Sequence, residues 1–258
     1  MALAETLTGI TLKTIDYTER SRIASYFSRE LGRLDVLLPQ AKGVKAKHAG
    51  ASELGGIFTL HVKPPKTGAT LYRLEQYEVH TSLVFSEGFE YEALEALMPC
   101  LELMKLLTLS FSGDALKRQR LFAQYEALLC LWKEADEPAF IKWSMLCFWQ
   151  GLLGLSGQIP LWRWDVVHQQ GLALTSDDKL YYLPQEGGLT QSSIALSPNA
   201  WQVSRGTWKA LCVLEALQAK SFKRFLDVPI PPLTTLFKLE AFYQAVLKSH
   251  GIELKSCG

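Results

Sequence analysis

The hydrophobic period of the chain changes once, and this change limits the possible folds more than any other feature. Up to about residue 80, apolar and polar residues alternate over short runs, as they do in β-strands with one buried face. From about Phe85, apolar residues recur every three to four positions, as on one face of an amphipathic helix. The sequence therefore predicts an α+β protein with a β domain at residues 1–80 and a helical domain at residues 81–258.

Five short strands are expected in the first domain. Alternating or β-branched runs cover residues 6–17, 22–28, 33–40, 56–63 and 69–79. Gly32 suits a tight hairpin between the second and third runs, and "PPKTG" at residues 64–68 is a strong turn before the last. Strands in this number and at this spacing indicate a small closed or partly closed barrel, and an OB-fold has five strands.

Three helices are expected after residue 85, over residues 90–110, 116–135 and 140–155, and Asp114 can cap the second. The third contains an apolar run of 13 residues, 143–155. Because a membrane span needs roughly 20 such residues, this helix is expected to lie in a core. In the first helix the inward-facing stripe is expected to comprise Leu94, Leu97, Met98, Leu101, Met104 and Leu107.

Two further helices are expected near the C-terminus. Ser197 followed by Pro198 has the pattern of a helix start, and helical periodicity then runs to about residue 220 with a break near Gly206. The last helix begins near Pro232 and ends at Gly251. The residues expected to face inward from it are Leu236, Leu239, Tyr243, Val246 and Leu247.

A small β insertion is expected within the helical domain, at about residues 158–195. The run "GLALTSDDKLYYLP", residues 171–184, predicts a hairpin that turns at Ser176, Asp177 and Asp178. The glycine-rich "GLLGLSG", residues 151–157, follows a helix and is expected to be a helix end rather than a phosphate-binding loop.

No motif of an enzyme is recognisable. The chain has no P-loop, no G-x-G-x-x-G after a strand, no H-E-x-x-H and no G-x-S-x-G. Its five histidines are scattered, and its five cysteines are far apart and odd in number, which favours free thiols over a disulfide framework. We therefore expect no catalytic residues, although a Cys/His pair formed only in the fold stays open. The N-terminus has no secretory pattern, so a cytoplasmic protein is expected.

The near-neutral net charge of +1 hides an uneven distribution. Residues 20–47 contain seven Lys and Arg against Glu30 and Asp35, whereas residues 87–105 contain five Glu against Lys105 alone. Concentrated positive charge on a small barrel is what phosphate binding needs. The aromatic residues of the same strands either fill the barrel or stack on bases, and a basic loop at residues 41–50 is either a solvated loop or a DNA-binding arm.

Several motifs in order resemble the RecO recombination mediators of bacteria. They are Leu12-Lys13-Thr14, Asp16-Tyr17, Ser21-Arg22-Ile23, Ser28-Arg29-Glu30 with Gly32, Ala41-Lys42-Gly43 with Lys45, "EGGL" at residues 186–189, and "YQAVLKSHGIELKS" at residues 243–256. The resemblance covers essentially the whole chain. It implies an OB-fold joined to a helical domain, binding of single- and double-stranded DNA, annealing of complementary strands, and action with RecR in loading RecA onto DNA coated by single-stranded DNA-binding protein (SSB).

One departure from the family pattern concerns zinc. Many RecO-like proteins carry two C-x-x-C pairs in the insertion, and the corresponding positions here are Trp164 and Val167, then Thr190 and Ser193. None of these is a zinc ligand. We therefore expect no metal and no other cofactor, and an insertion held by packing of Trp162, Trp164, Tyr181 and Tyr182.

An annealing factor must hold DNA mainly by its phosphates, because the base edges have to stay free to pair. The expected DNA contacts are Lys13, Arg20, Arg22, Arg29, Arg33, Lys42, Lys45, Lys47 and Arg73. The resemblance also implies a pocket for the acidic C-terminal tail of SSB. Cations that could line its rim are Lys220, Lys223 and Arg224, although they also suit the end of a solvated helix. The alternative function is a non-enzymatic scaffold that keeps the fold and partners but binds DNA weakly.

Overall fold

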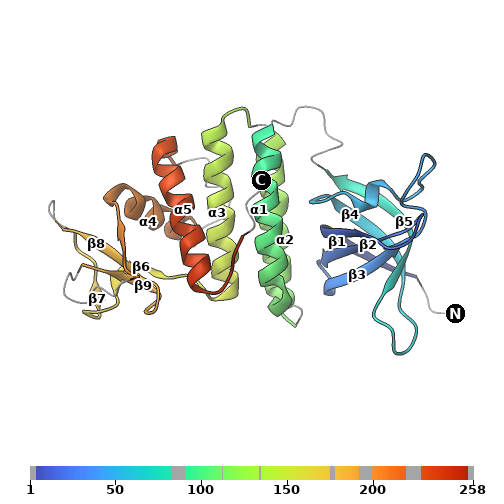
Figure 1. Cartoon of the computed structure of the whole chain (residues 1–258), viewed down its shortest axis with the longest axis horizontal. Helices are drawn as coiled ribbons and strands as arrows, with labels where there is room; N and C mark the ends of the chain where they lie inside the picture. The colour runs from blue at the N-terminus through green and yellow to red at the C-terminus, as the bar shows by residue number, and fades with distance from the viewer. Residues whose placement is uncertain are drawn as a thin grey trace. The chain divides into compact units, whose positions relative to one another are not determined.

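The computed structural model describes residues 4–82, 91–111, 113–133, 135–174, 178–191, 199–218 and 228–254. The chain divides into two compact units, residues 1–136 and residues 137–256. The first contains a β-barrel and helices α1 and α2, and the second contains helices α3 to α5 and a small sheet (Figure 1). The mixed α+β class is thus confirmed.

The barrel is closed, with strand order β1-β2-β3-β5-β4. Only β3 and β5 run parallel, and β1 pairs with both β2 and β4, as expected for an OB-like barrel. A bulge between Thr11 and Lys13 bends β1, which lets this long strand serve two neighbours. The strands are β1 (Glu5–Asp16), β2 (Arg22–Ser28), β3 (Gly32–Leu38), β4 (Ile57–Lys63) and β5 (Tyr72–Thr81).

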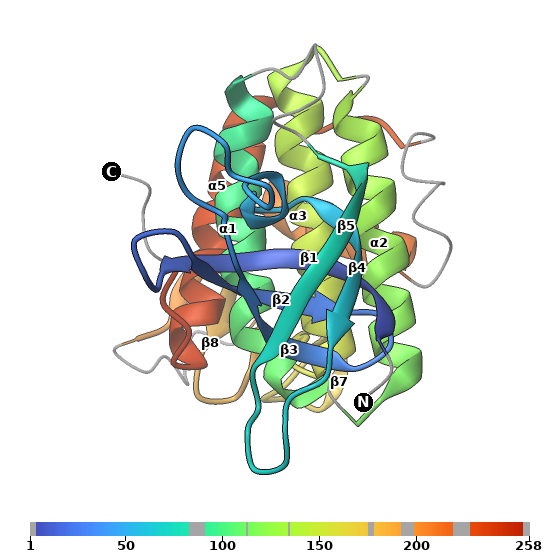
Figure 2. The same ribbon diagram turned by 90° about the vertical axis from the view of Figure 1, so that its right-hand side faces the viewer.

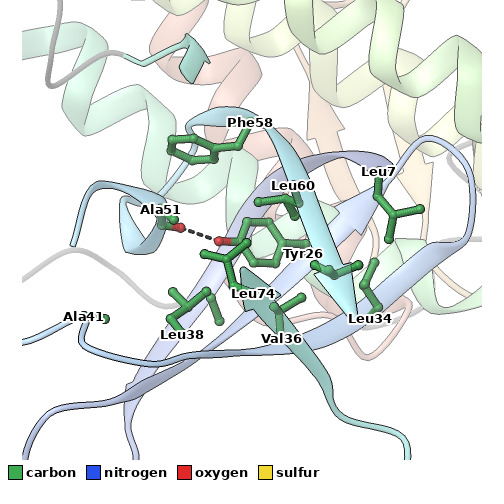
Figure 3. Close-up of a cluster of buried hydrophobic side chains, with 12 residues drawn as sticks. Leu7, Tyr26, Leu34, Val36, Leu38, Ala41, Ala51, Phe58, Leu60 and Leu74 are labelled. Carbon is green, nitrogen blue, oxygen red and sulfur yellow. Dashed lines mark hydrogen bonds between the residues drawn. The ribbon is translucent and has the colours of Figure 1, made fainter. Parts of the chain in front are cut away.

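Alternation along the strands builds the barrel core. Tyr26 lies at its centre, where its hydroxyl donates a hydrogen bond to the carbonyl of Ala51 in the 3₁₀ turn η1 (Gly50–Ser52) (Figure 3). Around it pack aliphatic side chains of the other strands, including Leu60 of β4 and Leu74 of β5. Gly9 permits this packing, because a Cβ there would come within 3.2 Å of Leu60 and Tyr26.

Helices α1 (Tyr91–Leu107) and α2 (Ala115–Lys133) follow, with the 3₁₀ turn η2 (Thr108–Phe111) between them. The predicted cap is confirmed, since Asp114 Oδ1 accepts the Lys117 backbone N–H at 3.0 Å. The predicted stripe of α1 is wrong at Leu94 and Met98, which are 36% and 40% exposed. The buried face instead includes the small residues Ala93, Ala96 and Cys100, which allow closer packing. Its members are Ala93, Ala96, Leu97, Cys100, Leu101, Leu103, Met104 and Leu107.

Polar contacts join α2 to the barrel within the first unit. The Tyr125 hydroxyl donates to the Gly55 carbonyl at 2.8 Å, and the half-buried end of Arg118 donates to the Glu30 carbonyl at 2.9 Å. Gly55 has φ +76°, and a Cβ there would lie 2.9 Å from the Tyr125 hydroxyl. The contact between α2 and the turn before β4 therefore depends on glycine at this position.

The second unit is built around the buried helix α3 (Pro138–Ser156), whose burial confirms the core assignment of its apolar run. Gly157 ends α3 in a left-handed conformation, φ 75°, so the glycine-rich segment is indeed a helix end. Helices α4 (Arg205–Gln218) and α5 (Leu233–Ser249) pack against α3 (Figure 1). The predicted inward face of α5 is confirmed, and so is its end at Gly251, φ 75°.

The small sheet has strand order β10-β8-β9-β6-β7. The predicted hairpin over residues 171–184 is wrong, because β7 pairs with β6 whereas β8 pairs with β9 and β10. Of the turn predicted at Ser176, Asp177 and Asp178, the first two residues lie outside the described residues. The hairpin present instead joins β8 to β9 through Gly187, φ 62°. The strands are β6 (Leu161–Asp165), β7 (Gln170–Gly171), β8 (Leu180–Leu183), β9 (Gly188–Thr190) and β10 (Trp201–Val203).

The helix predicted to start at Ser197 is also corrected. Residues 197 and 198 lie outside the described residues, and residues 201–203 form strand β10. Helix α4 begins only at Arg205, where the Ser204 hydroxyl accepts the Thr207 backbone N–H at 3.1 Å. A serine that caps a helix is present, but seven residues later than the Ser-Pro pattern indicated.

Aromatic packing fixes the sheet against the helices of the second unit. Trp162 and Tyr182 are fully buried and lie with ring centroids 5.7 Å and 5.2 Å from that of Phe242 on α5. Trp162 and Tyr182 therefore hold the insertion by packing, as expected. The expectation is not met by Trp164, which is 40% exposed.

Candidate nucleic-acid interface

Two of the predicted DNA contacts face the helices of the first unit. The Arg29 guanidinium lies 3.0 Å from Glu126 and 4.8 Å above the Phe122 ring, both on α2. Arg33 Nη1 donates to the Lys105 carbonyl at the end of α1, at 3.0 Å. These two arginines therefore help to hold the barrel on its helices, a role that their position in the sequence did not indicate.

Two more predicted contacts converge on one carboxylate. Lys42 Nζ lies 2.8 Å from Asp16 Oδ2, and Arg22 Nε lies 3.1 Å from Asp16 Oδ1. Hydrogen bonds from Lys42 and Arg22 lower the pKa of Asp16. This trio joins the β1–β2 connection to the loop after β3, and Asp16 occupies the place between two cations that a phosphate oxygen could take.

The loop at residues 39–49 is closed at its base by His48. The His48 backbone N–H donates to the Gln40 carbonyl at 3.2 Å, and ring Nδ1 lies 2.6 Å from the Pro39 carbonyl oxygen. Ring Nε2 lies 3.2 Å from the Glu75 carbonyl oxygen on β5. The loop is thus anchored both to itself and to the barrel wall, and Lys45 and Lys47 on it are exposed.

The concavity beside this loop has a volume of about 980 Å³. It lies between the loop, the ends of β4 and β5, and the β4–β5 hairpin, which projects downward in Figure 2. Two predicted contacts, Lys47 and Arg73, line it together with Lys63 and Lys66. Lys13, Arg20 and Lys45 are exposed but do not line it.

Lys63 and Lys66 were not predicted from the sequence. Both belong to the "VKPPKTG" run that joins the fourth and fifth strands, and in an OB-fold the loop between these strands borders the binding face. That position could have identified them. Lys63 also pairs with Glu75, so part of its charge is balanced within the protein.

The chemistry of the concavity favours phosphates over bases. It gathers four Lys and Arg side chains with His48, His61 and Glu75, and no Phe, Tyr or Trp is among its described lining residues. Cations fix a nucleic-acid backbone, whereas stacking on bases needs exposed rings. The barrel residues 1–82 carry eleven Lys and Arg against eight Asp and Glu, so the surrounding charge favours an anion as well.

Comparison with known families decides the identity of the barrel. Residues 1–83 match the family model described as the recombination protein O N terminal domain. By this match the barrel is similar to the N-terminal domain of RecO proteins. The match spans about a third of the chain, and RecO proteins are DNA-binding proteins of recombination and repair. No curated protein matches the sequence.

The residues at the positions expected for zinc do not fit the metal. Trp164, Val167 and Thr190 offer no thiolate or imidazole, and Ser193 lies outside the described residues. Within the described ranges, no three His, Cys, Asp or Glu side chains gather where they could hold a metal ion. The absence of zinc itself stays a prediction.

A buried carboxylate joins the same two segments instead. Asp165, at the end of β6, accepts the backbone N–H groups of Val167 and His168 at 2.9 Å. From β9 and the residue after it, Asp165 accepts the Thr190 hydroxyl at 3.0 Å and the Gln191 backbone N–H at 2.9 Å. Burial alone would raise the pKa of Asp165, but these hydrogen bonds and that of the His168 ring lower it to about 2.

Two further expectations concern partners and membranes. The cations proposed for the SSB tail, Lys220, Lys223 and Arg224, lie outside the described residues. In the part of the chain that the structure describes, no helix combines the length and the apolar character needed to cross a membrane.

Proposed function

We propose that this protein is a recombination mediator that binds single- and double-stranded DNA through its barrel and anneals complementary strands. The observation that carries the proposal is the cationic concavity lined by Lys47, Lys63, Lys66 and Arg73, without a stacking ring. A strand held there by its phosphates keeps its base edges available for a complement. Neutralising phosphates on two strands also reduces their mutual repulsion, so annealing needs no nucleotide hydrolysis and no catalytic residue.

The further steps of this proposal follow from the RecO family. We infer that the protein acts with RecR to load RecA onto DNA coated by SSB, and that its helical part takes the SSB C-terminal tail. Such a protein works on the nucleoid in the cytoplasm. Binding of purified RecR and of an SSB-tail peptide, each measured by calorimetry, tests these partners independently of DNA.

The DNA site is tested by titrating an oligo-dT strand at several salt concentrations. Changing Lys47, Lys63, Lys66 and Arg73 together to Ala should weaken binding strongly at low salt. Because each lost single-strand phosphate contact flattens the log–log salt slope by about 0.7, four contacts correspond to about 3. An unchanged affinity and slope would show that the concavity is not the DNA site.

The matched control changes four exposed lysines of the second unit, Lys179, Lys209, Lys238 and Lys248, to Ala. It alters the net charge equally and should leave affinity and slope close to those of the unmodified protein. A separate variant with Lys42, Lys45 and Lys47 changed to Ala tests the loop. If it has no effect while the concavity variant does, strands contact the barrel wall and not the loop.

A scaffold that binds DNA weakly is the second candidate function. It is favoured by the intramolecular partners of four predicted contacts, Arg22, Arg29, Arg33 and Lys42, whose charge is partly balanced within the first unit. Retained RecR binding without any DNA binding at low salt would select this alternative.

A further inference from the structure

His48 stands between two hydrogen-bond acceptors. Its ring is almost fully buried, 4% exposed, with Nδ1 at 2.6 Å from the Pro39 carbonyl oxygen and Nε2 at 3.2 Å from the Glu75 carbonyl oxygen. A neutral imidazole has one N–H and one lone pair. It can satisfy one of these carbonyls only, and its bare nitrogen then faces the oxygen lone pairs of the other. The imidazolium donates to both.

Some of the groups around the His48 ring favour its protonated form, and others disfavour it. The cations of the concavity, Lys47, Lys63, Lys66 and Arg73, disfavour a further positive charge at His48, as does a protonated His61. The two carbonyl oxygens favour it, the Glu75 carboxylate is engaged by Lys63, and the neutral Tyr77 ring packs edge-on at 6.3 Å. A polyanion in the concavity would offset the repulsion from the cations and leave the favourable influences in place.

We propose that His48 is a positioning residue that takes up a proton when a nucleic-acid strand binds beside it. The protonated ring fastens the base of the loop at residues 39–49 to β5 and so holds Lys47 at the rim of the concavity. Histidine is the side chain whose charge ordinarily changes between pH 5 and 8, so the coupling is sought in that range. The inference rests on the proposed DNA site and adds to it a proton linkage.

The test measures the affinity of the full chain for oligo-dT between pH 6 and 8 at constant ionic strength. Thymine does not titrate in this range, so any proton uptake belongs to the protein. We expect affinity to rise as the pH falls, by at most about tenfold per pH unit for one coupled proton. His48→Gln should bind more weakly at pH 6 and lose most of this pH dependence.

Two histidine variants separate His48 from its neighbours. His80→Gln, at an exposed β5 residue that bonds the Thr59 hydroxyl, should keep the full pH dependence. His61→Gln, inside the concavity, should keep most of it as well. If His48→Gln titrates like the unmodified protein, or if His61→Gln alone abolishes the effect, the inference is wrong. DNA binding that is salt-dependent but independent of pH would overturn it and leave the proposed function intact.

A second measurement does not depend on a variant that folds. In protein labelled with ¹⁵N at histidine, long-range proton–nitrogen spectra distinguish a protonated ring nitrogen from a bare one. In the complex with oligo-dT at pH 7, both nitrogens of His48 should be protonated. A bare nitrogen that persists in the complex would contradict the proposal.

Discussion

At the scale of single residues, Asp16 sets how much of the charge around the first connection is available to a ligand. Its carboxylate is exposed and engages Lys42 and Arg22, two of the cations expected to contact phosphates. Exposed ion pairs of this kind contribute little to stability, because water and salt screen them. Asp16 therefore competes with a bound phosphate more than it stabilises the barrel.

Asp16→Asn is expected to tighten binding of single-stranded DNA by about two- to fivefold at low salt, since Lys42 and Arg22 then no longer have to leave an exposed, weak ion pair. The salt slope should steepen by about 0.7 for each cation that gains a phosphate contact. Asp35→Asn, at an exposed carboxylate of β3 that bonds Ser25, is the matched control for net charge. Equal gains in both variants would mean that overall charge, and not release of Lys42 and Arg22, is responsible.

At the scale of elements, the small sheet of the second unit shows how a short insertion is secured. Strands of two to five residues cannot be stable alone, and here they are held by buried aromatic rings and by Asp165. Asp165 accepts bonds from both the segment after β6 and the segment at β9, so it links two parts of the chain that are distant in sequence. Its low pKa makes this link dependent on pH.

The pKa of Asp165 is about 2 in the folded protein and about 4 in an unfolded chain. A lowered folded pKa means that the charge contributes stability above about pH 4 and that this contribution is lost as the pH falls towards 2. The contribution is about 2 kcal/mol. In Asp165→Asn the charge is lost, and the new side-chain NH2 group faces N–H or O–H donors where a carboxylate oxygen accepted their hydrogen bonds. This variant should lower the free energy of unfolding at pH 7 by about 2–4 kcal/mol.

Urea unfolding at pH 7 and at pH 3 checks this prediction by tryptophan fluorescence. The difference between Asp165→Asn and the unmodified protein should shrink as the pH falls. Asp178→Asn, at an exposed carboxylate of the same unit, should change the unfolding free energy by less than about 0.5 kcal/mol. A difference that stays constant with pH would contradict an ionised, hydrogen-bonded Asp165.

At the scale of the whole molecule, the balance of charge restricts where DNA can bind. Residues 1–82 carry a net charge of +3, whereas residues 83–136 carry five Lys and Arg against nine Asp and Glu. A nucleic acid is therefore attracted to the barrel and repelled from the segment that follows it in the chain. A chain with a total charge of only +1 depends on this separation to bind a polyanion.

Annealing of two complementary oligonucleotides, followed by fluorescence quenching, tests the whole proposal. The full chain should accelerate annealing at low salt, with naked strands and with strands coated by SSB, and the acceleration should decline as salt rises. The concavity variant should lose it, because both strands need phosphate contacts. Binding of single strands without any faster annealing would restrict the function to DNA binding.

Local patterns in the sequence determined the barrel, most helices and the end of α3. Alternation, Gly32, the "PPKTG" turn and the Asp114 cap act between near neighbours, so their effect can be read along the chain. The strand pairing of the insertion, the small-residue face of α1 and the intramolecular partners of Arg29 and Arg33 were decided by tertiary structure. Each depends on which distant segments meet, and one sequence contains no direct record of that.

The candidate site shows the same division. The sequence placed positive charge in the loop at residues 39–49 and left His48 without a role. Only closure of the barrel brings Lys47 beside Lys63, Lys66 and Arg73. Only the tertiary structure places both ring nitrogens of His48 against backbone carbonyls, those of Pro39 just after β3 and of Glu75 on β5. The charge of each residue can be read from the sequence, but a binding site also requires that the residues lie close together. That proximity is set by the closed barrel.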